Sequence, residues 1–362
     1  MTTTIDRQTE TSTCNLKFDY TLSVVYKELK KLKNLQLYKT NRCILSEKSL
    51  KQVRLDCDRS FGGAVNITDE EESVYQNELY NVIVSILKLD SSLNYYQGFH
   101  DIIALFLYCF TVLDKHKHSL CYKYDLNRTA FVELLFVFTK KFLADFMREN
   151  IADTMIYLSY IPKLVKKINY NLYKELNVCN ANNTVNYPLS NIITLFNHDT
   201  NSERYAYTLL IIRYLLEASN ISFVLILYTV LLNDIQDKIY HLISDNAGSK
   251  DDFAIIYFKI NNYVSKAIND MPIEKFKIKL EESNKLIKEN KIKNTFKYSI
   301  KNKHLLINFD FDSEKNILIK ISLVSVNLFL LGTLKQTSSY TSPISIITSL
   351  FSIYNIYKTI SS

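Results

Sequence analysis

The amino-acid sequence predicts an all-α protein. Only five Gly and four Pro occur in 362 residues, whereas β and βαβ architectures need frequent tight turns. Apolar residues make up 47 % of the chain and charged residues 22 %, as in globular domains with a sizeable core. Apolar residues also recur at helical spacing over long stretches, such as 70–89. A chain of this length can hold one large domain or two modest ones.

The N-terminal region begins with a polar stretch. Six Thr occur among the first thirteen residues and no apolar signal-peptide core is present, so residues 1–19 are predicted to be a disordered, cytosolic tail. A short helix is expected over 22–35, with Leu22, Val25, Leu29 and Leu32 on one face. Residues 44–60 predict a second helix, which the Gly62-Gly63 pair ends.

The central region predicts a succession of helices within one domain, 20–272. Thr68, followed by a run of acidic residues that begins at Asp69, has the form of an N-cap for the helix over 70–89. The wholly uncharged run 221–232 is only twelve residues long, which favours a buried core helix over a membrane span. The other helices are expected at 99–113, 129–148, 153–169, 189–197, 203–217, 221–243 and 251–269.

After Pro272 the composition changes abruptly. Residues 274–303 contain ten Lys, four Glu and no Arg or Asp, so +6 of the net charge of +7 lies in this segment. We expect 273–315 to be a Lys-rich linker that contains an amphipathic surface helix over 273–293. A nucleic-acid-binding domain would instead carry Arg and aromatic residues on a basic folded surface, so that class is disfavoured.

The last segment, 316–362, is apolar. Residues 317–334 contain a single charge and 340–357 contain none, which predicts a membrane anchor formed by one span or a hairpin. The preceding lysines would keep the rest of the chain on the cytosolic side. Two helices of a soluble protein are the alternative interpretation.

The six cysteines are scattered. They form no CxxC pair and have no His at zinc spacing, which favours reduced thiols in the cytosol over disulfides or a metal site. His100 has no second His at ligand spacing, so we expect no metal site there either.

Two polar patches interrupt the apolar helices. In the first, 53–61, Asp56 and Arg59 are three residues apart and would share a helix face. The second, 93–101, contains Tyr95, Gln97 and Gly98. Taken alone, the first patch could be a surface ion pair and the second a connection between helices.

Together the patches resemble the catalytic motifs of the TBC-domain Rab GTPase-activating proteins, an IxxDxxR element followed by a YxQG element. The match is residue for residue at Asp56, Arg59, Tyr95, Gln97 and Gly98. In that family the first element supplies an arginine and the second a glutamine. The resemblance therefore implies that Arg59 is an arginine finger and Gln97 a glutamine finger.

The other motif residues would have supporting roles by the same resemblance. Asp56 would hold the guanidinium and Tyr95 would pack beneath the loop. Gly98 would let the backbone approach the partner or let the helix over 99–113 start without a Cβ clash. His100 and Asp101 match the polar pair that follows the glycine. A looser match lies at Phe196-Asn197-His198-Asp199 and extends to Arg204, for which we expect a structural role.

The resemblance covers about residues 20–270, with one departure. The family's early RxxxW motif is absent, since the chain has no Trp, and Asn41-Arg42 stands about where it would begin. We therefore expect a shortened N-terminal subdomain.

The resemblance implies a GTPase activator with no independent catalytic activity. It would need no cofactor or metal of its own, because GTP and Mg²⁺ are carried by the Rab partner. One branch of the family has a C-terminal membrane anchor, and its YxQG motif is similar to Asn94-Tyr-Tyr-Gln-Gly-Phe-His-Asp-Ile102. This similarity implies an early-secretory Rab as partner and a location on the cytosolic face of the endoplasmic reticulum or early Golgi. A catalytically silent Rab-binding module and a membrane-anchored helical scaffold remain as alternatives.

Overall fold

A computed structural model describes residues 5–35, 41–62, 67–178, 185, 187–198, 205–245 and 253–289. All of them belong to the first of two compact units, which comprises 1–290 and 296–305. The predicted anchor over 316–362 belongs to the second unit and lies outside the described residues, as does the linker after 289.

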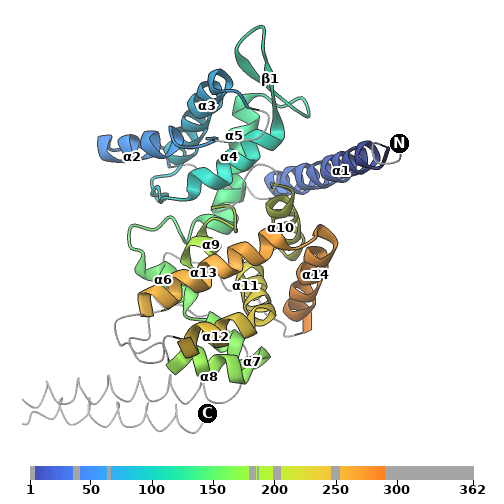
Figure 1. Ribbon diagram of the computed structural model, residues 1–362. Helices are drawn as coiled ribbons and strands as arrows, with labels where there is room; N and C mark the ends of the chain where they lie inside the picture. Colours follow the sequence, from blue (N-terminus) through green and yellow to red (C-terminus); the bar gives the residue numbers. More distant parts are fainter. Residues whose placement is uncertain are drawn as a thin grey trace, which may run out of the picture. The chain divides into compact units, whose positions relative to one another are not determined.

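The described part confirms the all-α prediction (Figure 1). The helices of its first half are α1 (Ile5–Leu35), α2 (Glu47–Cys57), α3 (Asp69–Lys88), α4 (Phe99–Phe110), α5 (Arg128–Phe138), the π-helical turn η1 (Thr139–Leu143), α6 (Ala152–Leu158), α7 (Ile161–Ile168) and α8 (Tyr170–Val178). Those of the second half are α9 (Leu189–Ile193), α10 (Tyr205–Ala218), α11 (Ser222–Asp234), α12 (Gln236–Asp245), α13 (Phe253–Asp270) and α14 (Ile273–Glu289).

The first helix is longer than expected. α1 begins at Ile5, so the structure differs from our prediction of a disordered tail over 1–19. No Gly or Pro occurs between residues 5 and 35, so nothing in the backbone ends the helix early. The predicted apolar face is confirmed, because Leu22, Val25, Leu29 and Leu32 are buried. α1 packs against α5 and α10 (Figure 1).

α2 and α3, the helices next to the first patch, are both capped at their N-termini, and the Thr68 cap was predicted. The Thr68 hydroxyl accepts from the Glu71 N–H, and the Glu71 carboxylate accepts from the Thr68 N–H, which completes a capping box at the start of α3. The Ser46 hydroxyl caps α2 in the same way by accepting from the Ser49 N–H. α2 and α3 then pack against each other and against α4.

A β-hairpin replaces the end of the helix predicted over 99–113. α4 ends at Phe110, and β1 (Thr111–Asp114) pairs antiparallel with β2 (Ser119–Tyr122). Thr111 and Val112 are β-branched, and the Thr111 hydroxyl donates to the Leu107 carbonyl at 2.6 Å. The side chain therefore satisfies a helix-end carbonyl at the point where the chain leaves the helix.

Three other predicted helices are divided. The helix over 129–148 is α5 followed by η1, and that over 153–169 is α6 and α7, where Pro162 occupies the first turn of α7. The helix over 221–243 is α11 and α12.

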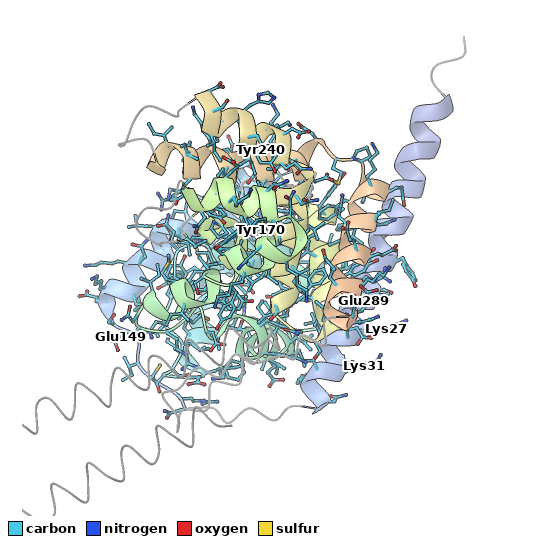
Figure 2. All side chains as sticks on the ribbon, turned by 90° about the horizontal axis from the view of Figure 1, so that it is seen from below. Lys27, Lys31, Glu149, Tyr170, Tyr240 and Glu289 are labelled. Atoms are coloured by element: carbon cyan, nitrogen blue, oxygen red, sulfur yellow. The ribbon has the colours of Figure 1, made fainter. Side chains whose placement is uncertain are left out.

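The centre of the core is α11, as predicted for the uncharged run. Every residue from Ser222 to Leu232 is buried, and Tyr228 is among the largest fully buried side chains. Among the described residues, no helix is long and apolar enough to cross a membrane. Figure 2 shows side chains filling the space between the helices, while Lys27 and Lys31 are exposed on α1.

The helix after Pro272 is part of the folded domain, which corrects its assignment to a linker. α14 packs against α10 and α11 (Figure 1). Phe276 and Leu280 are fully buried, and Lys279 forms an ion pair with Asp234 of α11. The amphipathic pattern was interpreted correctly, but its apolar face covers the core.

Candidate functional site

The first patch is built around a buried carboxylate. Asp56, on the last turn of α2, is 1 % exposed, and its Oδ1 lies 2.5 Å from Arg59 Nη2. Gln52, one turn earlier, donates to Oδ2 at 3.1 Å. Arg59 follows the helix end and its side chain is 68 % exposed. The buried acid thus holds a guanidinium that faces solvent.

The electrostatics keep this acid charged. Burial raises the pKa of Asp56, but hydrogen bonds from Gln52, Tyr95 and Arg59 outweigh it and hold the pKa below its ordinary value. The neighbouring Cys57 is buried, and burial raises the pKa of its thiol to about 12. The charged Asp56 carboxylate therefore forms an ion pair with Arg59. The raised pKa makes the Cys57 thiol a poor nucleophile.

A hydrogen bond from Tyr95 to Asp56 joins the two patches. The Tyr95 hydroxyl donates to Asp56 Oδ2 at 2.8 Å across 39 residues of sequence. Burial and this carboxylate raise the pKa of Tyr95, so the phenol remains a donor. The sequence placed Tyr95 beneath the loop, and the structure shows that it connects the Gln97 segment to the acid that holds Arg59.

The turn that carries Gln97 is held by its neighbours. Gly98 has φ +110°, and a Cβ there would lie 2.8 Å from Thr194 Cγ2. Only glycine fits that approach and that left-handed backbone. The Tyr96 hydroxyl donates to the Ile193 carbonyl at 2.7 Å. Gln97 itself is exposed and forms no hydrogen bond with any described residue.

Asp101 connects this turn to the third, looser motif. His100 Nε2 and His198 Nδ1 lie 3.2 Å and 3.0 Å from the two carboxylate oxygens of Asp101. Asn197 donates to the Asp101 backbone carbonyl at 2.7 Å. His100 Nδ1 accepts from the Gly98 N–H at 3.3 Å, which leaves no free ring nitrogen for a ligand. These contacts therefore connect the first turn of α4 to residues 197 and 198.

The structure joins Asp56, Arg59 and Tyr95 by hydrogen bonds, and Gln97 lies two residues after Tyr95. Arg204 and Asp199 lie outside the described residues. Sequence reasoning missed Gln52, although its spacing of four from Asp56 on a helix was an available signal. In the described part of the chain, no group of His, Cys, Asp or Glu is arranged to hold a metal ion.

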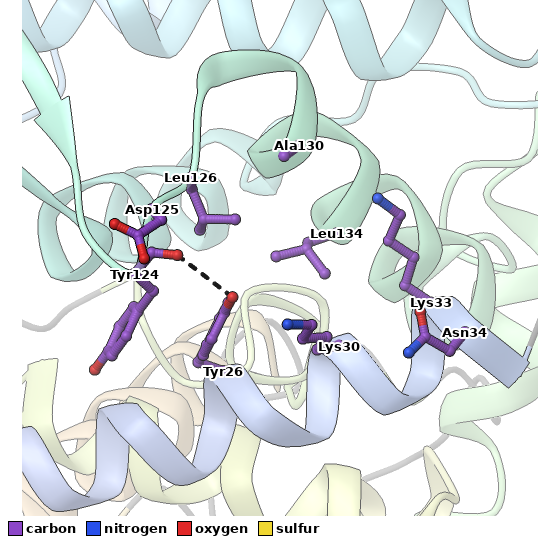
Figure 3. Close-up of a pocket in the computed structure, with 9 residues that line it drawn as sticks. All are labelled: Tyr26, Lys30, Lys33, Asn34, Tyr124, Asp125, Leu126, Ala130 and Leu134. Carbon is purple, nitrogen blue, oxygen red and sulfur yellow. Dashed lines mark hydrogen bonds between the residues drawn. The ribbon is translucent and has the colours of Figure 1, made fainter.

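A cavity of about 340 Å³ lies elsewhere, between α1 and the segment 124–134 (Figure 3). Tyr26 stacks on Tyr124 with ring centroids 4.5 Å apart and donates to its carbonyl. Lys30 and Lys33 border the cavity, and Lys33 pairs with Glu133. None of the residues that line it belongs to the two patches, where Arg59 and Gln97 are exposed.

That exposed surface can perform a limited chemistry. A guanidinium donates to anionic oxygens and neutralises developing charge, and a carboxamide can orient a water molecule. The two groups lie on segments that one buried carboxylate and one tyrosine tie together. An exposed guanidinium and an exposed carboxamide lie on these two segments.

The family model for the Rab-GTPase-TBC domain matches residues 12–240. The chain belongs to this family. GTPase-activating protein GYP8 of Saccharomyces cerevisiae is 32 % identical over 159 residues, which cover 41 % of this chain and 30 % of the relative. TBC1 domain family member 20 of Bos taurus is 30 % identical and that of Homo sapiens 28 %, each over 152 residues that cover 42 % of this chain and 33 % of the relative. The matches thus span about a third of each relative's length.

Proposed function

We propose that the protein accelerates GTP hydrolysis by a Rab GTPase, with Arg59 and Gln97 entering the active site of the partner. The observation that carries the proposal is the Tyr95–Asp56–Arg59 arrangement. It joins the two motifs and leaves the guanidinium exposed. Membership of the TBC family and the name of the yeast relative support the same function.

Phosphoryl transfer needs little covalent help. It needs positive charge against the transferring oxygens and a water in line with them. Arg59 would supply the first and Gln97 the second. An arginine supplied in trans is worth about 10³–10⁵ in rate. The Rab would carry GTP and Mg²⁺, so this chain would need no cofactor of its own and would have no independent catalytic activity.

We place this activity at the cytosolic face of the endoplasmic reticulum or early Golgi, on an early-secretory Rab. The support is in the sequence. Segments 317–334 and 340–357 are long and almost uncharged, and the Lys-rich segment 274–303 precedes them. The anchor would hold Arg59 and Gln97 close to membrane-bound Rabs.

The test is single-turnover GTP hydrolysis across the Rab set of the source organism, with the full chain as wild type, Arg59→Ala and Gln97→Ala. We expect stimulation of one or a few Rabs, lost by about 10³-fold in Arg59→Ala. Binding of GTP-loaded Rab without stimulation would indicate a silent binding module. No preference for the GTP-loaded form would indicate a scaffold, and either result would reject the proposal.

A further inference from the structure

The turn that carries Gln97 begins at a buried ion pair that no motif includes. Lys140 Nζ lies 2.6 Å from Asp90 Oδ2, and the two side chains are 18 % and 9 % exposed. The other oxygen, Asp90 Oδ1, accepts from the Ser92 N–H at 2.9 Å. Lys140 also donates to the Ser92 hydroxyl at 3.3 Å. Asp90 thus bonds the turn itself through Oδ1, and its Oδ2 is held by Lys140 of another segment.

Lys140 belongs to an unusual backbone segment. It lies in η1 (Thr139–Leu143), which follows α5 directly. A π-helical turn contains an extra residue, so it rotates the side chains that follow it to a different face of the helix. Such turns are rare and frequently occur at functional sites. In this chain the π-helical turn contains Lys140, the residue that pairs with Asp90.

The same segment holds the turn at a second point. The Asn94 N–H donates to the Met147 carbonyl at 2.8 Å, and the Asn94 side-chain amide reaches the same oxygen at 3.4 Å. Met147 is fully buried, so this carbonyl is fixed by the core. Residues 140–147 therefore contact the chain on the N-terminal side of Gln97, while Ile193 and Thr194 contact it at Tyr96 and Gly98.

We infer that Lys140 is a positioning residue for Gln97. It does not touch the GTPase partner. It holds Asp90, and through Asp90 the turn over 90–94, so that the carboxamide three residues later is presented at a fixed place. The inference rests on the proposed function, because Gln97 needs a fixed place only if it orients the attacking water.

The experiment uses the full chain with Lys140→Met, which keeps the length of the side chain and removes its charge, and Lys140→Arg, which restores a charge. Hydrogen exchange is measured on the amides of 91–98, and kcat and KM are measured on a stimulated Rab. Lys33→Met is the matched control, because it removes an ion pair between helices, with Glu133, that has no contact with the turn.

We expect faster exchange at 91–98 in Lys140→Met, with unchanged exchange in α3. We also expect a fall in kcat of about 10-fold with KM within about 2-fold, as for a misplaced reacting group. Lys140→Arg should recover most of kcat, and Lys33→Met should change neither quantity. In a Gln97→Ala background, Lys140→Met should have little further effect on kcat, whereas in an Arg59→Ala background the two losses should multiply.

Unchanged exchange at 91–98 in Lys140→Met would overturn the inference. So would a fall in kcat of the same size in the Gln97→Ala background, because the residue would then act on the whole domain. If the wild type stimulates no Rab, the proposed function fails by itself, and the exchange measurement still decides whether Lys140 orders the turn.

Discussion

Two buried carboxylates in this domain each hold one arginine and one tyrosine, with opposite consequences. Asp56 accepts from Arg59 and Tyr95. Glu78, on α3, is 7 % exposed and accepts from Arg128 and Tyr122. Both groups combine a carboxylate, an arginine and a tyrosine. They differ in which acceptors bind the nitrogens of the arginine.

The Arg128 guanidinium forms hydrogen bonds within the fold. Its Nε donates to Glu78 Oε1 at 2.6 Å and its Nη2 pairs with Oε2, across 50 residues of sequence. Arg59 directs one nitrogen to an acid three residues away and its Nε to the Leu55 carbonyl. An ion pair so close in sequence restricts little of the chain. Arg128 therefore links α5 to α3, whereas Arg59 constrains little of the fold and its side chain is 68 % exposed, as the proposed role in trans requires.

The largest expected effect is on activity, in Arg59→Lys. An ammonium keeps the charge but lacks the planar fork that spans two phosphate oxygens. GTPase stimulation should fall by at least about 100-fold, while the free energy of unfolding should change by less than about 1 kcal/mol. Single-turnover hydrolysis and denaturant unfolding measure the two quantities. Retained stimulation would show that the fork is not used.

The next effect is on stability, in Glu78→Gln. Removing the charge leaves Arg128 without its bidentate partner, and because Arg128 is half exposed we expect a loss of about 2 kcal/mol, below the value for a fully buried pair. Stimulation per folded molecule should not change. A loss of stimulation in excess of the unfolded fraction would mean that the clamp also shapes the site.

The two tyrosines provide a matched pair. Tyr95→Phe and Tyr122→Phe each remove one hydrogen bond to a buried carboxylate and should each cost about 1.5 kcal/mol of stability. Only Tyr95→Phe should also lower kcat, by about 10-fold, because it releases Asp56 and with it Arg59. Equal effects on kcat in both variants would remove the distinction between the two groups.

The smallest effect is on the pH dependence of unfolding. The folded pKa of Asp56 lies below its ordinary value, since the hydrogen bonds outweigh the effect of burial. Its contribution to stability is therefore complete above an unfolded pKa of about 3.9 and is lost as pH falls through the folded pKa. Asp56→Asn should flatten the fall in unfolding free energy on the acid side of about pH 4. The exposed Asp58→Asn controls for the loss of one charge, and equal flattening in both would contradict this assignment.

The sequence predicted the helical class and the Asp56–Arg59 pair because both depend on local signals. The apolar period gave α3 and α11, and Thr68 gave the start of α3. The pairing of Asp56 with Arg59 followed from a spacing of three. Membership of the TBC family, expected from the two motifs, is confirmed by the family model.

The remaining features depend on contacts between distant residues. The Tyr95–Asp56 bond and the Lys140–Asp90 pair each span about 40 to 50 residues, and no local pattern specifies either one. The hairpin after Phe110 was hidden in an apolar run that continues into β1. α14 has the composition of a linker, and only its packing on α10 and α11 shows that it belongs to the domain.

The most direct test compares Arg59→Ala with Arg128→Ala and measures both unfolding free energy and GTPase stimulation per folded molecule in each. The account predicts a crossed result. Arg59→Ala should lose about 10³-fold of stimulation and only about 1 kcal/mol of stability, because Gln52 and Tyr95 still bond Asp56. Arg128→Ala should lose about 2–3 kcal/mol of stability with stimulation intact. If Arg59→Ala keeps its stimulation, or if both variants lose the two quantities together, then Arg59 is a structural residue like Arg128 and the central claim is wrong.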